Sequence, residues 1–248
     1  MQIIARLDVK NEHVIKGIHL EGLRKVGDPN QLALKYYEAE IDEIIFMDAV
    51  ASFYDQNNLF NIIEKACEEV FVPITIGVGL RSVDDVVRAM DSGADKAVIN
   101  TGAVRDIHLV EQIANRFGSQ CLIGSIEAKY RTDSWIAYVD NGREPTNLDA
   151  VNWAHSLESA GVGEILVTSI DKEGTGRGFD IELVEQLQDK TRRPIIVSGG
   201  YGSPKHIEDL LSCVTPSAVA FASVLHYQRE TVADLRSTIS LKLAGNVG

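Results

Sequence analysis

Short runs of β-branched and other apolar residues alternate with longer amphipathic stretches along the whole chain. Eight of the short runs are typical of buried strands: residues 3–9, 43–47, 74–76, 96–99, 121–126, 164–168, 194–197 and 218–222. Helical spacing fills eight longer stretches: residues 30–39, 57–70, 83–91, 106–117, 149–160, 180–190, 204–212 and 230–243. Strands that alternate with helices predict parallel βαβ units.

Chain length limits the architectures that fit this alternation. Eight βα units in 248 residues match a (β/α)8 TIM barrel. A doubly wound open sheet is the alternative, but it usually has fewer strands at this length, and the GxGxxG turn that often follows its first strand is absent. We therefore expect an α/β fold in which residues 1–248 form one (β/α)8 barrel domain. Ser82 and the pair Ser203-Pro204 stand where two predicted helices begin.

An internal repeat divides the chain into two halves. Landmarks recur at an offset of about 120 positions: Asp8 with Glu127, Glu43 with Glu164, the turn 77–79 with 198–200, and residues 97–104 with 218–225. The repeat predicts two fused half-barrels of four βα units each. In such a barrel Asp8 and Glu127 would face each other across the mouth.

Two strand ends carry glycine turns, Gly77-Val78-Gly79 and Ser198-Gly199-Gly200. The chemistry of a (β/α)8 barrel lies where its strands end and its βα loops begin. Without a Cβ, the backbone approaches a phosphate closely and points N–H groups at it, so the pair of turns predicts a substrate with a phosphate at each end. Strand-to-helix turns also need glycine for structural reasons alone, and the β-branched Val78 restricts the first turn.

Asp8 and Glu127 follow apolar strand residues, where a carboxylate is costly unless it reaches a polar cavity. Opposed across a barrel mouth, they are candidates for a general acid and a general base acting on one substrate. The alternative is a pair of structural carboxylates satisfied by Lys10, Lys129 or backbone N–H groups.

Residues 11–29 form a long connection for a βα loop, and such connections inside compact domains are often lids. The segment carries Lys16, Arg24 and Lys25, which would attract an anionic ligand within an acidic protein. A solvated loop is the alternative.

Composition narrows the function classes further. The formal net charge is −12 at pH 7, and a nucleic-acid-binding surface needs clustered basic residues, so we expect no nucleic-acid partner. No apolar run approaches the length of a membrane span and no secretory signal is evident, so we expect a cytoplasmic protein without a membrane partner. Cys67, Cys121 and Cys213 are expected to be buried free thiols, and neither a metal nor a cofactor is indicated.

Several segments are similar to one enzyme family over essentially the whole chain: LDVK, VIKGIHLEGLR, GDP, DEIIFMDAVAS, GADKAVINTGAV, FGSQ, GEILVTSIDKEGTGRGFD and PIIVSGGYG. These segments resemble the cyclase subunit family of imidazole glycerol phosphate synthase, which acts in histidine biosynthesis. The resemblance implies a (β/α)8 barrel that takes ammonia from a separate glutaminase subunit. The ammonia would react with a bis-phosphorylated ribulosyl aminoimidazole carboxamide, giving imidazole glycerol phosphate and an aminoimidazole carboxamide ribotide.

The resemblance also implies roles for individual residues. Asp8 would be the principal acid/base for attack of ammonia, and Glu127 would serve the second proton transfer. The phosphate-binding positions, with two serines added from the strand ends, are Gly79, Asn100, Thr101, Ser169, Gly174, Ser198, Gly199, Gly200 and Ser223. The charged ring that gates ammonia at the barrel bottom falls on Glu43, Lys96 and Glu164, with Gln2 in the fourth position. Lys16 lies in the expected lid, Asp95 falls where the family contacts its glutaminase, and no cofactor is expected.

Three residues depart from the family pattern: Glu127 and Glu173 replace aspartates, and Val78 replaces a glycine. A misplacement of about 1 Å costs on the order of a hundredfold in rate, so the departures leave alternatives open. One is a paralogous barrel that supplies ammonia for acetamidino groups on a nucleotide sugar in surface-polysaccharide synthesis. Another is a non-catalytic scaffold that conducts ammonia to another enzyme. A half-barrel isomerase of the same pathway is a weaker rival.

Overall fold

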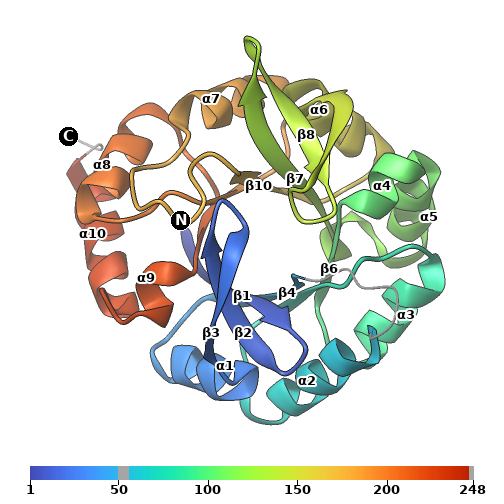
Figure 1. Cartoon of the computed structure of the whole chain (residues 1–248), viewed down its shortest axis with the longest axis horizontal. Coiled ribbons are helices and arrows are strands. Elements are labelled where there is room, and N and C mark those ends of the chain that lie inside the picture. Colours follow the sequence, from blue (N-terminus) through green and yellow to red (C-terminus); the bar gives the residue numbers. More distant parts are fainter. Residues whose placement is uncertain (50–55, 246–248) are drawn as a thin grey trace.

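Eight parallel strands close into a barrel (Figure 1). The structure is a computed structural model that describes residues 1–49 and 56–245, apart from the side chains of residues 56–58. The barrel strands are β1 (Gln2–Lys10), β4 (Glu43–Asp48), β5 (Ile74–Gly77), β6 (Lys96–Ile99), β7 (Leu122–Arg131), β10 (Glu164–Ser169), β11 (Ile195–Ser198) and β12 (Ala218–Phe221). Because β12 pairs with β1, no barrel edge is left open, and the predicted (β/α)8 TIM barrel is confirmed. Residues 50–52 of the DEIIFMDAVAS segment lie outside the described residues.

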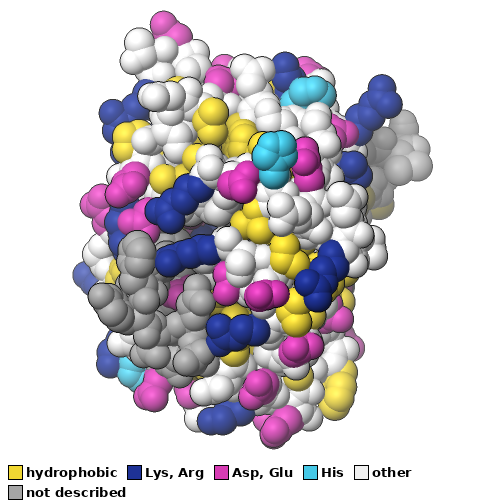
Figure 2. All heavy atoms as spheres, turned by 90° about the vertical axis from the view of Figure 1, so that its right-hand side faces the viewer, with side chains coloured by type: hydrophobic (Ala, Val, Ile, Leu, Met, Phe, Trp, Pro, Cys, Tyr) yellow, Lys and Arg dark blue, Asp and Glu magenta, His cyan; other side chains and the backbone are white. Residues whose placement is uncertain are grey.

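Helices surround the barrel where the sequence predicts them. They are α1 (Pro29–Glu38), α2 (Gln56–Glu69), α3 (Val83–Asp91), α5 (Ile107–Phe117), α6 (Ala150–Ala160), α7 (Ile181–Lys190), α8 (Pro204–Cys213) and α10 (Val232–Gly245). Two short helices, α4 (Thr101–Arg105) and α9 (Ser223–His226), and the 3₁₀ turn η1 (Ser119–Cys121) were not predicted. On the side of the barrel that carries α3 and α5, acidic and basic side chains are interspersed (Figure 2).

The long connection at residues 11–29 contains two strands that were not predicted. The segment forms an antiparallel ribbon of β2 (His13–Ile18) and β3 (Glu21–Gly27), and β2 also pairs with β1. Its turn places His19 and Leu20 at φ 53° and 64°, the paired positive angles of a tight hairpin turn. A second ribbon, β8 (Ser134–Val139) and β9 (Glu144–Asp149), extends β7 in the same way.

The barrel strands alternate between two apolar layers. Odd-numbered residues of β1 such as Ile3 and Leu7 join the layer under the helices, whereas Ile4 joins an inner cluster that fills the barrel. The inner cluster consists of Ile4, Ile45, Met47, Val98, Ile123, Leu166, Ile196, Ala218 and Ala220. Because strand side chains alternate, Arg6 and Asp8 point to the same inner side as Ile4.

The element order supports two fused half-barrels. Each half begins with a barrel strand, a ribbon and a helix, continues with two βα units, and ends with a strand followed by a short and a long helix. The strand registers also correspond, because Ile4 pairs with Glu43 and Ile123 pairs with Glu164. The short helices α4 and α9 begin after residues of nearly identical conformation, Asn100 (φ −129°, ψ −86°) and Ala222 (φ −129°, ψ −83°).

The expectation of three buried thiols was wrong, although all three cysteines are free. Cys67 and Cys121 are half-buried, and Cys213, the last residue of α8, is exposed. Apolar neighbours in the sequence did not determine how deeply each thiol lies. Within the described residues, no helix is long and apolar enough to cross a membrane, and no group of three or more His, Cys, Asp and Glu side chains could hold a metal ion.

Candidate active site

Asp8 and Glu127 lie on opposite sides of the barrel and line one narrow cavity. Asp8 is on the inner face of β1, and Glu127 is on the equivalent strand of the second half, β7. Arg6, Lys16 and Glu173 line the same cavity, which the β2–β3 ribbon covers through Leu20 and Leu23. The structure thus brings the two predicted catalytic carboxylates together, and it adds three charged groups between them.

Two cations hold Asp8 in its ionised form. Arg6 Nε donates to Asp8 Oδ1 at 2.9 Å, and Lys16 Nζ lies 3.5 Å from Oδ2. Burial alone would raise the pKa of Asp8, but the adjacent Arg6 and Lys16 outweigh it and lower that pKa. Asp8 is therefore a carboxylate at neutral pH, with oxygens that accept protons weakly.

Glu127 has a different environment. Its Oε2 accepts hydrogen bonds from the Gly142 amide at 2.7 Å and from Asn100 Nδ2 at 3.2 Å, both neutral donors. Burial raises the pKa of Glu127 from its ordinary 4.5 to about 7, although Arg6 and the Gly142 amide oppose the rise. A carboxyl group with this pKa takes up and releases a proton near neutral pH, which suits a general acid or base.

Sequence reasoning missed Arg6, which is only 4% exposed. Its Nη1 donates to Thr168 Oγ1 at 2.8 Å and to Ser198 Oγ at 3.2 Å, so the guanidinium reaches from β1 to β10 and β11. The signal was present: a basic residue two positions before Asp8 on a buried strand shares the inner face with it. Three carboxylates, Asp8, Glu173 and Glu127, and two hydroxyls surround the guanidinium, which satisfies the rule that buried charges are paired.

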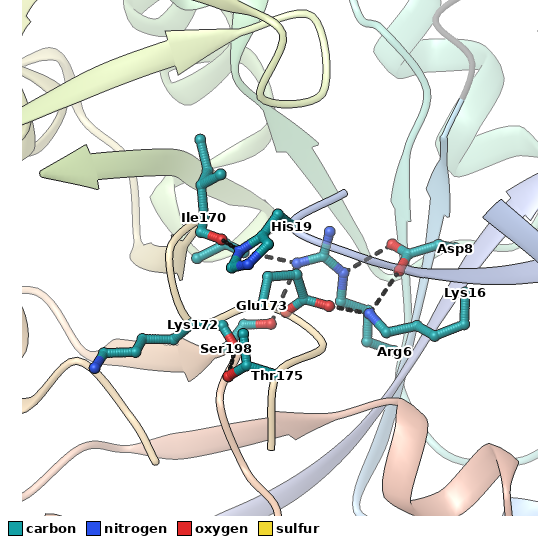
Figure 3. A network of polar contacts seen from close by, with 10 residues as sticks. Arg6, Asp8, Lys16, His19, Ile170, Lys172, Glu173, Thr175 and Ser198 are labelled. Atoms are coloured by element: carbon teal, nitrogen blue, oxygen red, sulfur yellow. Dashed lines mark hydrogen bonds and ion pairs between the residues drawn. The ribbon is translucent and has the colours of Figure 1, made fainter. Parts of the chain in front are cut away.

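An ion pair between Lys16 and Glu173 attaches the β2–β3 ribbon to the barrel mouth (Figure 3). Burial would lower the pKa of Lys16, but Glu173 and Asp8 outweigh it and raise that pKa, so Lys16 is charged. Further along the ribbon, His19 donates its amide to the Glu173 carbonyl at 2.8 Å, and its Nδ1 lies 2.8 Å from the carbonyl oxygen of Ile170. Lys16 thus lies in a segment that covers the cavity.

The predicted phosphate residues of the second half come together in one cavity. Gly174, Ser198, Gly199, Gly200 and Ser223 line it with Lys16. Gly200 has φ 105°, and a Cβ there would lie 2.1 Å from the Gly178 carbonyl oxygen, so this glycine also has a structural reason. Ser169 does not line this cavity, and its hydroxyl donates to Asp180 at 2.7 Å.

A wider, basic cavity of about 710 Å³ adjoins this cluster. Gly174 and Ser223 border both cavities, and the cationic side chains around the wider one come from the ribbon and from the loop after α9: Lys16, Arg24, Lys25 and Arg229. In a chain with a net charge of −12, this is a local attraction for an anionic ligand.

The predicted phosphate residues of the first half are engaged by the protein itself. Asn100 Nδ2 donates to Glu127 and, at 3.3 Å, to the Tyr138 carbonyl, while Thr101 Oγ1 accepts from the Asp140 amide at 3.1 Å. The turn between β8 and β9 therefore lies over these residues. Gly79 has φ 34°. Val78 is buried in the apolar layer under the helices, so its side chain packs away from the side of the 77–79 turn on which a phosphate would bind.

The predicted charged ring forms at the opposite end of the barrel. Lys96 Nζ lies 2.9 Å from Glu43 Oε2 and 2.8 Å from Glu164 Oε1, and Thr75 donates to Glu43 at 2.7 Å. Gln2 and Asp95 are exposed, and Asp95 accepts the Ile74 amide at 2.8 Å. The three ring members are thus brought together.

Sequence reasoning also missed His226 of α9, which is buried beside the cavity. Its Nδ1 lies 2.7 Å from the Tyr36 hydroxyl, while its Nε2 has no hydrogen-bond partner among the residues that the structure describes. Burial, with a smaller contribution from Lys16, lowers the pKa of His226 to about 4, so this imidazole is neutral at pH 7.

The chain is similar to known proteins over most of its length. The profile of a family described as "Histidine biosynthesis protein" matches residues 2–231. Imidazole glycerol phosphate synthase subunit HisF of Legionella pneumophila is 53% identical over 203 residues, which cover 82% of this chain and 96% of that protein. The subunit of the same name from Hydrogenobaculum sp. is 40% identical over 237 residues (95% and 94%), and that from Pyrococcus furiosus is 42% identical over 235 residues (95% and 93%).

Proposed function

The chain belongs to the histidine biosynthesis protein family, and from this premise we propose that it is the cyclase subunit of an imidazole glycerol phosphate synthase. Its relatives carry that enzyme's name at 40–53% identity over most of both chains, which does not favour a nucleotide-sugar paralogue or a non-catalytic scaffold. The reaction would use ammonia and a bis-phosphorylated ribulosyl aminoimidazole carboxamide, and it would yield imidazole glycerol phosphate and an aminoimidazole carboxamide ribotide.

The proposal rests on one observation. Two carboxyl groups line one cavity at the barrel mouth, and the pKa of Asp8 is lowered whereas that of Glu127 is raised. Glu127, with a pKa of about 7, is the better group for accepting a proton from attacking ammonia and returning it during imine formation. Asp8, held ionised by Arg6 and Lys16, would orient the substrate as a fixed negative charge. This division gives the main acid/base role to Glu127, whereas the resemblance alone implies that role for Asp8.

The two phosphates would lie on either side of these carboxylates. The cavity of Gly174, Gly199, Gly200 and Ser223 offers backbone N–H groups, with the basic side chains of the neighbouring cavity nearby. On the opposite side, Gly79, Asn100 and Thr101 would hold the second phosphate once the Asp140 amide leaves Thr101.

A separate glutaminase would supply the ammonia at the barrel bottom. The ring of Glu43, Lys96 and Glu164, together with the exposed Asp95, would face this partner in a heterodimer. The barrel interior above the ring is apolar, and an apolar route admits neutral NH3 far more readily than the ammonium ion.

Turnover by the isolated chain with an ammonium salt at mildly alkaline pH tests the proposal without the glutaminase. The rate should fall about 100- to 10,000-fold in Glu127→Gln and by at least about 100-fold in Asp8→Asn. Glu111→Gln, on the exposed side of α5, is the matched control and should keep the full rate. Absence of turnover by the unmodified, folded chain would reject the proposed function.

A further inference from the structure

Arg6 is a cation inside the reaction cavity that the proposed function uses only to keep Asp8 ionised. It lines the cavity with Asp8 and Glu127. The charged or titratable groups around it come from five separate segments: Asp8 on β1, Lys16 on β2, Glu127 on β7, Glu173 after β10 and His226 on α9. A structural ion pair alone does not require an arginine that reaches across the barrel.

Two of the three guanidinium nitrogens are fixed by the protein. Nε donates to Asp8, and Nη1 donates to Thr168 and Ser198, which sets the plane and direction of the group. Within residues 1–49 and 56–245, Nη2 makes no hydrogen bond or ion pair, and Figure 3 draws no contact from it. Nη2 is therefore a preoriented donor that remains available to a molecule entering the cavity.

We propose that Arg6 is a catalytic residue, whose Nη2 donates to the substrate carbonyl oxygen at the carbon that ammonia attacks. This inference rests on the proposed function. The ammonia lone pair forms the C–N bond while the carbonyl π pair moves to the oxygen, which becomes an alkoxide beside the guanidinium. Two protons then pass from nitrogen to oxygen by way of Glu127. The C–O bond breaks, water leaves, and the nitrogen lone pair completes the C=N bond of the imine.

The geometry suits this step because the charge is in place before it is needed. A fixed donor in a buried cavity stabilises a developing oxyanion without reorganisation, and removing one such donor lowers kcat by about 100- to 1,000-fold. Arg6 and Glu127 line the same cavity, so one group can hold the oxygen while the other moves the proton. Thr168 and Ser198 are positioning residues, since they act only through Arg6.

The competing account makes Arg6 purely a partner that keeps Asp8 ionised. The pH dependence of kcat in Arg6→Met, with an ammonium salt as nitrogen source, separates the two accounts. Loss of an oxyanion donor predicts a kcat at least about 100-fold lower at every pH from 7 to 9, with KM changed less than about threefold. A loss that disappears at alkaline pH, where Asp8 is ionised without help, would overturn the proposal, and so would a kcat within threefold of the unmodified chain.

Chemical rescue is the second measurement. Arg6→Ala leaves room for a guanidinium ion, and millimolar guanidinium chloride should raise its kcat at least about tenfold. Potassium chloride at equal ionic strength is the control and should give no rise. Absence of rescue in a variant that binds substrate normally counts against the proposal.

Thr168→Val keeps the test decisive if the Arg6 variants fail to fold, as judged by circular dichroism. It retains the guanidinium but removes one of its anchors, so kcat should fall about three- to tenfold at unchanged KM. Full kcat in Thr168→Val would then reject the inference. Absence of turnover by the unmodified chain would reject the proposed function and this inference together, whereas turnover that survives the loss of Arg6 rejects the inference alone.

Discussion

The two half-barrels place a carboxylate at the same point of a repeated strand and give it opposite chemistry. Asp8 on β1 is held ionised by two cations, whereas Glu127 on β7 accepts only neutral donors and has a pKa of about 7. The backbone around them is equivalent, since Ile4 and Ile123 pair with Glu43 and Glu164 in the same register. The difference between the halves therefore comes from individual side chains.

The decisive difference lies two positions before each carboxylate. Arg6 precedes Asp8, and the equivalent residue before Glu127 is Ser125, which is also buried. Counted through the strand pairings of the two ribbons, Lys16, the second cation, corresponds to the uncharged Val139. A repeated fold thus supplies two opposed positions, and a few substitutions on one side make one carboxylate a fixed charge and the other a proton carrier.

Each of the two ribbons contacts the opposite half of the barrel. The β2–β3 turn of the first half contacts the second half through His19 and the Ile170 carbonyl. The β8–β9 turn of the second half contacts the first half through Asn141, whose Nδ2 donates to the Asp48 carbonyl at 3.3 Å. Each half is therefore covered by the other, and neither half carries a complete site.

Arg6→Ser makes the first half resemble the second and should have the largest effect on stability. The change removes one partner of a buried ion pair and leaves the hydroxyls of Thr168 and Ser198 without their donor. We expect the free energy of unfolding at pH 7 to fall by about 3–5 kcal/mol in denaturant titrations. Ser125→Ala is the matched control and should change it by less than about 1 kcal/mol. Equal effects of the two substitutions would show that Arg6 does not distinguish the halves.

The barrel could be predicted from sequence because its strands and helices have strong periodicity. The predicted run 96–99 is β6 and the predicted helix 83–91 is α3, residue for residue. The first ribbon could not be predicted, because the turn at His19 and Leu20 lacks the Asn-Gly pattern that usually marks positive φ angles. The second ribbon turns at Asn141-Gly142, which is that pattern, so the sequence contained a hairpin signal that the prediction missed. Strand β7 likewise runs to Arg131, beyond the predicted end at residue 126.

The sequence predicted where the two carboxyl groups of the site lie, but not their pKa values. The repeat was sufficient to place Asp8 opposite Glu127, because matched strands end at matched points. Their pKa values depend on contacts from the unpredicted ribbons, namely Lys16 for Asp8 and the Gly142 amide for Glu127. Among the charged groups that set these pKa values, Arg6 alone could have been found from the sequence, because it lies on the inner face of a buried strand.

The pH dependence of stability in Glu127→Gln tests the difference between the two carboxyl groups. The folded protein binds the Glu127 proton more tightly than the unfolded chain does, so stability falls as pH rises from about 4.5 to about 7. The shift corresponds to about 3 kcal/mol. Glutamine does not titrate, so the stability of Glu127→Gln relative to the unmodified chain should rise by about 3 kcal/mol between pH 4 and pH 8 in urea unfolding. Asp8→Asn should show no such gain, because the pKa of Asp8 is lowered rather than raised.

The charged ring at the barrel bottom offers a smaller contrast between equivalent residues. The Glu43 side chain is 1% exposed and accepts from Thr75 as well as Lys96, whereas the Glu164 side chain is 19% exposed. Glu43→Gln should therefore lower the free energy of unfolding by about 2 kcal/mol, and Glu164→Gln by less than about 1 kcal/mol. Thermal unfolding of both variants in one buffer measures the difference. A larger loss in Glu164→Gln would mean that burial does not set the strength of this ring.

The smallest contrast lies at two helix starts that the repeat makes equivalent. Ser82 begins α3 with a full capping box, since its hydroxyl accepts the Asp85 amide at 3.2 Å and the Asp85 side chain accepts the Ser82 amide at 3.0 Å. Ser203 begins α8, but its side chain makes no cap hydrogen bond, and Pro204 in the first turn presets the helix instead. Ser82→Ala should lower the free energy of unfolding by about 1 kcal/mol, whereas Ser203→Ala should leave it nearly unchanged. Equal losses in denaturant titrations would mean that Ser203 caps its helix in solution, and the two halves would then be alike at this point.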